Sequence, residues 1–245
     1  MSALTVGMGH QTLVGIGEEV TFGTPVTRTL GLRVMEAGLA LKQQTIQKTV
    51  LGHSSKHVNI AGRRSVEGNL KLICPPEGAA IKMLLKHALG SISSPAGTLM
   101  DDAVTTLTTH TFALTDALPE AGLSIETDAD NANTGEAFLF ASCKANKLTL
   151  SQALDDALMM VLSFMGQQKT EVSATGGLTY QSLKTFDWDD LVVTLGGVAI
   201  DVESFELNIE NNLDGDSYKL GSLLRKNIRR KDTRSVSGKI EMELE

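Results

Sequence analysis

The sequence predicts a mainly β fold with one α-helix. Apolar and polar residues alternate along much of the chain, as in SFELNIENN at 204–212 and KIEMELE at 239–245, and a period of two is typical of half-buried strands. Glycines separate many of these stretches, and a single segment has helical periodicity instead. A chain of 245 residues is long enough to bury a full core, and no linker interrupts it, so we expect one domain over residues 1–245.

The clearest strands lie in the second half of the chain. KLTLS at 147–151 places two leucines on one face, and LMMVLSFMGQQ at 158–168 is apolar on both faces, which is typical of a central strand. DDLVVTLGGVAIDVESFEL at 189–207 predicts a hairpin with Gly196 and Gly197 at or near its turn.

The helix is predicted at about residues 77–89, within PPEGAAIKMLLKHALGS. Its apolar residues are three or four positions apart (Ile81, Leu84, Leu85, Ala88 and Leu89). Lys86 and His87 fall in the last turn, where the helix dipole favours cations, and Gly90 is placed to end the helix. We expect this amphipathic helix to pack on a sheet.

Three stretches are poor in core residues and are expected to reach outward. Two are extended polar arms at about 41–65 and 211–235, and a Thr-rich stretch lies at 93–112. Polar arms on a compact β body suit either loops or subunits that contact their neighbours.

Composition excludes several classes of function. The net charge of −7 disfavours tight, non-specific binding of DNA, and an aromatic content of 4% gives little material for base stacking or a sugar shelf. Cys74 and Cys143 are expected to be buried free thiols in a reducing compartment. The first residues lack the features of a signal peptide, and the most apolar run, 157–166, is too short to span a membrane.

No catalytic, cofactor or metal motif is found. Gly15-Ile16-Gly17 is followed by two glutamates, which would repel a pyrophosphate. His53 and His57 lack a third ligand, and the acidic stretch from Asp128 lacks the glycine and final glutamate of a calcium loop. No Ser occurs in a GxSxG elbow. An enzyme is therefore the weakest hypothesis, and we expect no cofactor and no metal.

The order of these features resembles a known family. GIGEEVTFGTPV at 15–26 is followed by the polar arm, by RSVEGNLKLICPPEGAAIKMLLKHALG at 64–90, and by the strand pair KANKLTLSQALDDALMMVLSFMG at 144–166. The chain ends with the hairpin VTLGGVAIDVESFELNIENNL at 193–213 and the strand RSVSGKIEMELE at 234–245. This arrangement resembles the tail tube (major tail) protein of long, non-contractile-tailed bacteriophages, over nearly the whole chain.

The resemblance implies a β-sandwich or half-barrel with one flanking helix. It also implies hexameric rings that close an inter-subunit β-barrel and stack into the tail tube, the conduit for DNA delivery. The implied partners are further copies of the chain, the tape-measure protein and transiting double-stranded DNA in the lumen, and tail terminator and distal tail proteins at the tube ends, without a membrane. The implied location is the virion tail, and the host cytoplasm during assembly.

Candidate contact residues follow from the arms and the family motif. We expect inter-subunit contacts at Thr24 and Pro25 and at five basic residues, Arg63, Arg64, Arg229, Arg230 and Lys231. The basic run 223–231 is expected to pair with acidic faces of this subunit or of another. The hairpins at Leu41–Leu72 and Asn146–Gln168 are the candidates for lining the lumen.

A short motif occurs twice in the chain. Arg64–Leu70 reads RSVEGNL and Arg234–Ile240 reads RSVSGKI, with Gly68 and Gly238 at equivalent positions. A glycine within a strand often marks a bulge or a close backbone approach. We expect the two copies to be equivalent strands entering the sandwich.

Two alternatives to the tail tube function stay open at this stage. One is another ring-forming tube or baseplate protein, including the inner tube of a contractile injection system. The other is a non-catalytic carbohydrate-binding β-sandwich, although a single tryptophan and two tyrosines make a sugar shelf hard to build. Trp188 is expected to be a core or interface anchor.

Overall fold

The structure is a computed structural model of the whole chain. It describes residues 13–49, 51–52, 58–76, 78–94, 98–99, 106–107, 109–128, 137–180 and 184–242. His53 and His57, and most of the acidic stretch after Asp128, lie outside the described residues.

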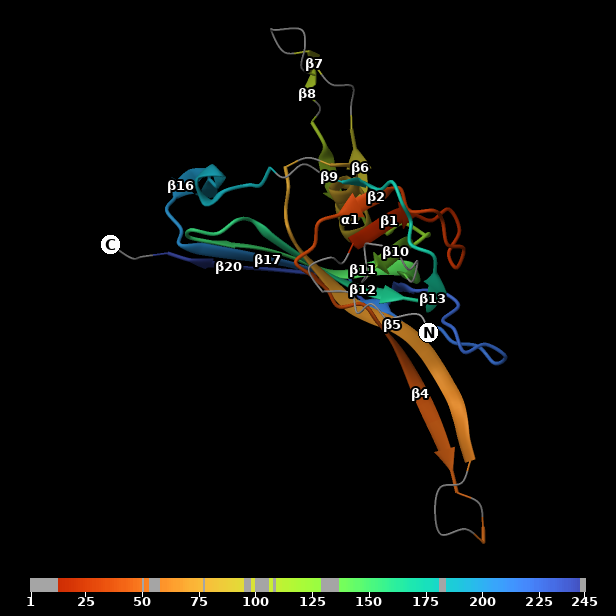
Figure 1. Cartoon of the computed structure of the whole chain (residues 1–245). Coiled ribbons are helices and arrows are strands. Elements are labelled where there is room, and N and C mark those ends of the chain that lie inside the picture. Colours follow the sequence, from red (N-terminus) through yellow and green to blue (C-terminus); the bar gives the residue numbers. More distant parts are fainter. Residues whose placement is uncertain are drawn as a thin grey trace.

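The described chain is mainly β with a single α-helix, which confirms the predicted fold class (Figure 1). In chain order its elements are β1 (Leu13–Glu18), β2 (Leu30–Leu32), β3 (Glu36–Ala37), β4 (Ala40–Lys48), β5 (Val58–Ile73), α1 (Ala79–Leu89), β6 (Gly90–Ser93), β7 (Thr98–Leu99), β8 (Thr106–Leu107), β9 (Thr111–Leu114), β10 (Leu123–Asp128), β11 (Ala137–Ala153), β12 (Met159–Gly166), β13 (Gln168–Val172), β14 (Thr179–Tyr180), a 3-10 turn η2 (Trp188–Asp190), β15 (Val193–Leu195), β16 (Val198–Ile200), β17 (Ser204–Glu210), β18 (Leu213–Asp214), β19 (Arg229–Arg230) and β20 (Ser235–Glu241).

Twelve of these strands form one large sheet that divides at β11. The first half of β11 pairs with β10 and β13, and we call this part, with β1, β2 and β14, sheet A. The second half pairs with β12 and β17, and this part, with β3, β4, β5 and β20, is sheet B. Ser142 has a positive φ of 55° and the β11–β12 register shifts between Ala145 and Lys147, so β11 bends where it passes from one sheet to the other.

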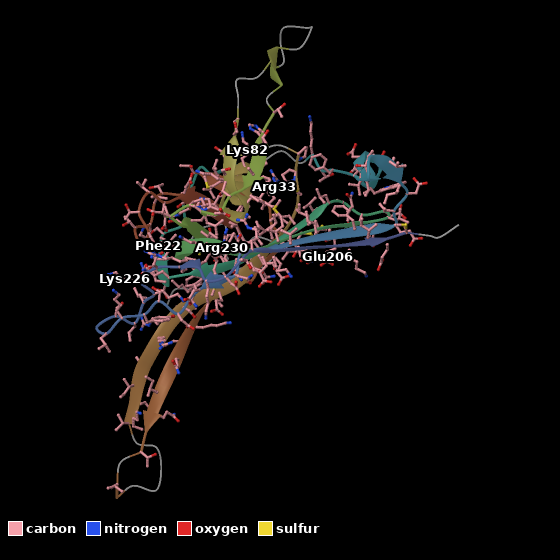
Figure 2. All side chains as sticks on the ribbon, turned by 180° about the vertical axis from the view of Figure 1, so that it is seen from behind. Phe22, Arg33, Lys82, Glu206, Lys226 and Arg230 are labelled. Carbon is pink, nitrogen blue, oxygen red and sulfur yellow. The ribbon has the colours of Figure 1, made fainter. Side chains whose placement is uncertain are left out.

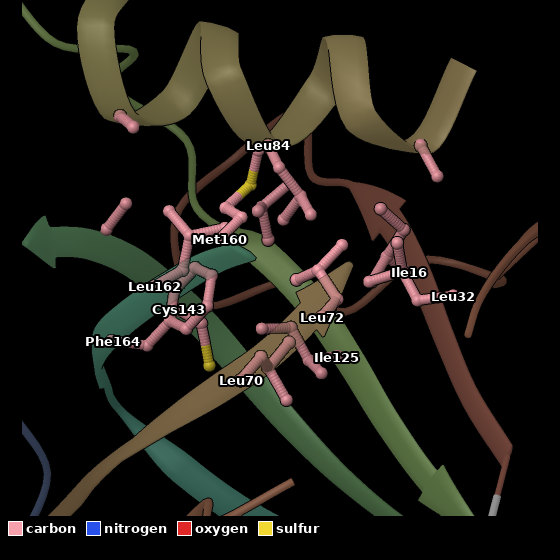
Figure 3. Packing of buried hydrophobic residues seen from close by; sticks show 14 of the residues in the cluster. Ile16, Leu32, Leu70, Leu72, Leu84, Ile125, Cys143, Met160, Leu162 and Phe164 are labelled. Atoms are coloured by element: carbon pink, nitrogen blue, oxygen red, sulfur yellow. The ribbon is translucent and has the colours of Figure 1, made fainter. Parts of the chain in front are cut away.

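Sheets A and B and helix α1 enclose one hydrophobic core (Figure 3). Sheet A contributes Ile16 and Ile125, sheet B contributes Leu70 and Leu162, and the helix inserts Leu84; all are fully buried. Because apolar residues alternate in the strands and recur every three to four positions in the helix, each element turns one apolar face to this centre.

Three parts of the chain project from this body (Figure 1). The β4–β5 hairpin extends to one side, the β6–β9 hairpin with β7 and β8 extends to the opposite side, and the ends of β17 and β20 extend to a third. The predicted turn at Gly196 and Gly197 is confirmed: it joins β15 to β16, and both glycines have positive φ, 62° and 85°.

The segment 211–235 does not project as a whole. Asn211, Arg225 and Ile228 are buried within it, at 1%, 4% and 0% exposure. The sequence suggested a free polar arm because the segment is charged throughout, but three well-spaced residues are enough to attach it to the body.

Candidate functional site

Sheet B has two open edges among the described residues. Its strand order is β20-β17-β11-β12-β5-β4, with every neighbouring pair antiparallel. Within the described residues, β20 pairs only with β17 and β4 only with β5. All seven residues of β20 and all nine of β4 are exposed. Each edge therefore presents unpaired backbone groups that can pair with a further strand.

The backbone groups of β20 that point to its open edge can be identified residue by residue. The carbonyl of Glu241 accepts a hydrogen bond from the amide of Glu203 on the β17 side, 2.8 Å away. Backbone groups alternate between the two sides of a strand, so Val236, Gly238 and Ile240 point their N–H and C=O groups to the open edge. These are the backbone groups that a further strand would bind.

The open edge of β20 also carries apolar side chains. Val236, Ile240 and Met242 are 54%, 42% and 46% exposed. By register, Val236 and Ile240 lie on the same face of the sheet as Phe205 and the buried Ile209 of β17. The apolar face of sheet B thus continues beyond the core to its open edge, which is a pattern typical of an interaction surface.

The opposite face of sheet B is polar and of mixed charge. By register, this face carries Glu67, Asn69, Lys71, Lys147, Thr149, Ser151, Ser163, Glu206, Asn208, Glu210, Ser237, Lys239 and Glu241, and the apolar residues on it are Ile73, Met159, Val161 and Met165 of β5 and β12. Figure 2 labels Glu206 on the projecting end of this sheet. The candidate lumen hairpins, Leu41–Leu72 and Asn146–Gln168, contain the four adjacent strands β4, β5, β12 and β11 of this face.

The β4–β5 hairpin, which we call the arm, is the most exposed part of sheet B. Beyond the body it is a two-stranded ribbon, and its apolar residues Ile46, Val58 and Ile60 are 38%, 38% and 47% exposed. The predicted extended arm at 41–65 falls on this hairpin. A two-stranded ribbon is only marginally stable alone in water, so the arm is built to be covered by a partner or held by the body.

The family motif at 15–26 folds around a buried carboxylate. Glu19 is 3% exposed, and its oxygens accept hydrogen bonds from Ser124 Oγ (2.9 Å), Ser142 N (2.8 Å) and Ser142 Oγ (2.7 Å). Ser142 Oγ also accepts a bond from Gly23 N at 2.6 Å, and Ser124 Oγ accepts one from Val26 N at 3.1 Å. This network fixes the loop that carries the two predicted contact residues of the motif.

Thr24 and Pro25 are both exposed at the outside of that loop. Thr24 N donates to Thr21 O at 3.1 Å, which closes a turn, and the neighbouring Val20 is 89% exposed. Their exposure is compatible with a contact role, which stays a prediction.

A second buried charge lies after the motif. Arg28 forms a salt bridge with Glu126, whose side chain is 3% exposed. Glu126 also accepts bonds from Thr175 N (2.7 Å) and Thr175 Oγ1 (2.8 Å). The pair joins the segment before β2 to β10 and to the loop after β13.

Helix α1 is joined to the end of β1 by a third charged group. Glu18 Oε1 accepts from Lys86 Nζ at 2.6 Å and lies 3.1 Å from His87 Nε2. The hydrogen bond from the buried His87, together with Lys86, lowers the pKa of Glu18 to about 2. The predicted position of both cations in the last helical turn is confirmed.

The structure brings Arg63 and Arg64 against the segment 211–235. The Arg63 guanidinium stacks over the Tyr218 ring at 5.0 Å and lies 3.8 Å from an Asp216 oxygen. Arg64 N donates to Leu223 O at 2.9 Å, and its carbonyl accepts from Tyr218 Oη at 2.9 Å. Both arginines therefore contact their own subunit, and their side chains remain exposed.

The other three basic candidates lie elsewhere in the same segment. Arg229 and Arg230 form β19, which pairs with β18. Arg230 donates to Thr115 O at 3.4 Å, and the amide of Lys231 donates to Asn212 O at 2.9 Å. Arg229 and Lys231 are exposed, and an inter-subunit role for them stays a prediction.

The residue of the basic run that meets an acidic partner is Arg225. Its Nη2 lies 3.0 Å from Glu67 Oε1, and the Arg225 side chain is only 5% exposed. Sequence reasoning did not single out Arg225, Glu19 or Glu126. The sequence held only an indirect indication for Arg225, since the basic run as a whole was expected to pair with acidic faces. A charged residue is rarely buried without a partner, but the sequence does not show which charged residues are buried.

The two glycines of the repeated motif have different surroundings. A Cβ on Gly68 would lie 2.2 Å from Gly38 O, and Gly68 has a φ of 155°. A Cβ on Gly238 would meet nothing closer than Glu206 O at 3.7 Å. The two copies run in the same direction in sheet B, but the register places Gly238 level with Leu72. The glycine of the motif therefore has a different structural role in each of the two copies.

The described residues offer no catalytic or metal-binding constellation. Among them no group of three His, Cys, Asp or Glu side chains is placed to hold a metal ion. Burial raises the pKa of the Cys74 thiol to about 11 and also raises the pKa of Cys143, which disfavours the reactive thiolate form of both. A shallow cavity of about 550 Å³ is lined by Phe186 and Asp187 among others.

Trp188 was expected to be a core or interface anchor. It is 50% exposed in the turn η2, so it is not a core residue. In the described part of the chain, no helix has the length and apolar character needed to cross a membrane.

Comparisons with known proteins identify the family of the chain. The sequence profile of the family described as phage tail tube protein matches residues 9–245. No curated protein matches the chain. A chain of the cryo-EM structure of the anti-feeding prophage baseplate is 11% identical, with a TM-score of 0.40, over 71% of this chain and 98% of that chain. Because the family profile covers nearly the whole sequence, the chain belongs to the phage tail tube protein family and is a structural protein of the phage tail.

Proposed function

We propose that the chain assembles into hexameric rings by pairing the β20 edge of one copy with the β4 edge of the next, and that the rings stack into the tube through which DNA is delivered. The observation that carries the proposal is the pair of open, fully exposed edges at opposite ends of sheet B. Different surfaces meet at such a head-to-tail joint, and the arrangement closes when rotation returns to the first subunit.

Strand direction supports this joint. Six strands of sheet B follow one another from β20 to β4, and each neighbouring pair is antiparallel; the two-residue β3 pairs with β5 on the same side as β4. With an even number of alternating strands, β4 and β20 run in opposite directions, so a neighbouring copy related by rotation presents an antiparallel partner. Closing the sheet in this way removes both exposed edges.

Side-chain chemistry supports a polar lumen. The polar face of sheet B, with its mixed charges and hydroxyl and amide groups, is suited to a channel that DNA passes without being bound. The chain as a whole has a net charge of −7, which disfavours tight attachment of the phosphate backbone. We propose that this face, including β4, β5, β11 and β12, lines the lumen, and that the tape-measure protein occupies it before DNA does.

The joint can be tested with an edge proline. Ile240→Pro removes an N–H that points to the open edge and leaves the β17 side intact, a position where proline is tolerated. Lys239→Pro is the matched contrast, because its N–H points toward β17. We expect Ile240→Pro to keep the far-ultraviolet circular dichroism and thermal midpoint of the unchanged chain and to lose assembly, whereas Lys239→Pro lowers the thermal midpoint.

The readout is negative-stain electron microscopy and sedimentation velocity over a concentration series. Rings or tubes from the unchanged chain that are absent in Ile240→Pro support the joint. Rings formed equally well by Ile240→Pro refute the β20 joint, and an unchanged chain that stays monomeric even with preformed tail tips as initiators refutes self-assembly.

A further inference from the structure

The segment between β18 and β19 contacts the arm at the point where the arm leaves the body. We propose that residues 214–227, which we call the strap, fix the direction of the β4–β5 arm, with Arg225 as the central positioning residue. The role in assembly rests on the function proposed above, because it is the arm that would carry β4 to the next copy.

The strap forms hydrogen bonds with the edge of β5 beyond the last residue that pairs with β12. β12 pairs with β5 only from Ile73 to Val66, opposite Gly166. The next residue of β5 whose backbone groups point to that edge is Arg64, and the strap binds both of them. The Arg64 N–H donates to Leu223 O, and the Arg64 carbonyl accepts a hydrogen bond from Tyr218 Oη, each at 2.9 Å. The strap therefore extends the support of β5 beyond the last strand of the body.

Arg225 joins three elements at this point. Its Nη2 donates to Glu67 Oε1 of β5 at 3.0 Å, its Nη1 lies 3.5 Å from the carbonyl of Gly166 at the end of β12, and its Nε donates to Tyr218 Oη at 3.2 Å. The backbone is held as well, since Gln167 Nε2 donates to Arg225 O at 2.7 Å. A buried guanidinium with several partners in fixed directions restrains all of them together.

Glu67 connects this centre to the other strand of the arm. Its second oxygen accepts from Lys42 Nζ of β4 at 2.7 Å, and the hydrogen bonds from Lys42 and Arg225 lower the pKa of Glu67. One carboxylate thus links β4, β5 and the strap. Figure 2 shows Lys226, the neighbour of Arg225, on the strap beside the root of the arm.

The arm has a point at which it can bend. The β4–β5 register shifts between Gln43 and Thr45, opposite Gly62 and Arg63, which forms a bulge just beyond the strap. The Arg63 side chain stacks on Tyr218 at this bulge. Without the strap the ribbon would pivot here, and ordering it on binding would oppose assembly through lost conformational freedom.

The strap contact is tested first by amide exchange of the unassembled chain. Tyr218→Phe removes the hydroxyl that binds Arg64 and Arg225 but keeps the ring under Arg63. Tyr180→Phe is the matched control, because the Tyr180 hydroxyl is buried and has no hydrogen-bond partner among the described residues. The Arg64 amide donates to Leu223 O of the strap, and the Tyr218 hydroxyl helps to hold the strap in place. We therefore expect this amide to exchange about fivefold faster in Tyr218→Phe, the change that the loss of one neutral hydrogen bond produces. Its exchange rate should be unchanged in Tyr180→Phe.

Arm direction is tested by the distance between two spin labels, at Gln47→Cys on β4 and Thr179→Cys on β14, both exposed. The buried Cys74 and Cys143 do not compete for the label, because burial raises their pKa. We expect one narrow distance distribution in the parent and in Tyr180→Phe, and its loss in Tyr218→Phe and in Arg225→Ala.

These outcomes decide the proposal independently of ring formation. If Arg225→Ala fails to fold, Tyr218→Phe alone decides. A narrow, unchanged distribution in Tyr218→Phe, or equal broadening in Tyr180→Phe, overturns the strap as a positioning element. Because both measurements use the unassembled chain, a failure of the parent to form rings would overturn the proposed function and leave the strap result standing.

Discussion

The charged group between β1 and the helix allows a stability prediction with a defined pH window. Glu18→Gln removes the carboxylate that binds Lys86 and His87. The fall of the Glu18 pKa from 4.5 to about 2 corresponds to roughly 3 kcal/mol at 1.36 kcal/mol per pKa unit. About a third of the side chain is exposed, and solvent screens such pairs, so we expect a loss of about 1–2 kcal/mol at neutral pH.

The sign of the pH dependence follows from the direction of the shift. A carboxylate whose pKa is lower in the folded state stabilises the fold above its ordinary pKa, and this contribution is lost as the pH falls from 4.5 toward 2. The difference in unfolding free energy between the parent and Glu18→Gln should be constant from pH 7 to 5 and fall to less than half by about pH 3.

The assay is urea denaturation followed by circular dichroism at pH 7, 5, 4 and 3. At neutral pH the thermal midpoint of Glu18→Gln should be roughly 2–8 °C lower for a chain of this size. Glu171→Gln, which changes an exposed glutamate of β13, serves as the control and should stay within about 0.5 kcal/mol. A Glu18→Gln deficit that is the same at pH 3 as at pH 7 would refute the reasoning, because the loss would then not arise from the carboxylate charge.

Three further predictions test the core, the buried charge and the repeated motif. Leu84→Ala should lower the free energy of unfolding by about 2–5 kcal/mol in urea titration, because its fully buried side chain fills the space between helix and sheet. Glu126→Ala should cost about 3–5 kcal/mol in the same titration, because it leaves Arg28 buried without its partner, whereas the double variant with Arg28→Met should recover much of the loss. Gly68→Ala should cost more than about 2 kcal/mol by thermal unfolding, because the added Cβ meets a backbone oxygen, whereas Gly238→Ala should stay within about 0.5 kcal/mol; equal losses for the two glycines would contradict the different surroundings described above.

Local pattern was sufficient for the helix, one turn and several of the strands. The helix at Ala79–Leu89, the turn at Gly196 and Gly197 and the alternating strand Ser204–Glu210 were predicted from spacing and turn chemistry, because each depends on residues close together in the sequence. The buried state of both cysteines was predicted as well. These features need no information about distant parts of the chain.

The candidate site was predicted less completely, since it depends on distant contacts. The sequence pointed to Arg63 and to the basic run 223–231 as a whole, but it did not single out Arg225 within that run, because the role of Arg225 depends on Glu67, 158 positions away. Glu19 was noted only as a residue that would repel a phosphate, and its burial follows from the bend of β11 at Ser142. A hydrogen-bonded charge is recognised only when its partners are known.

The sequence by itself determined the mainly β class, the single helix, the order of the strands along the chain and the resemblance to tail tube proteins, because periodicity, turn residues and motif order are properties of neighbouring residues. The tertiary structure decided how β11 is shared between two sheets, which edges of sheet B stay open, and that the segment 211–235 folds back onto the arm. It also separated the two copies of the repeated motif. Register, burial and charge pairing join residues that are far apart in the chain, and only the folded backbone brings these residues within hydrogen-bonding distance.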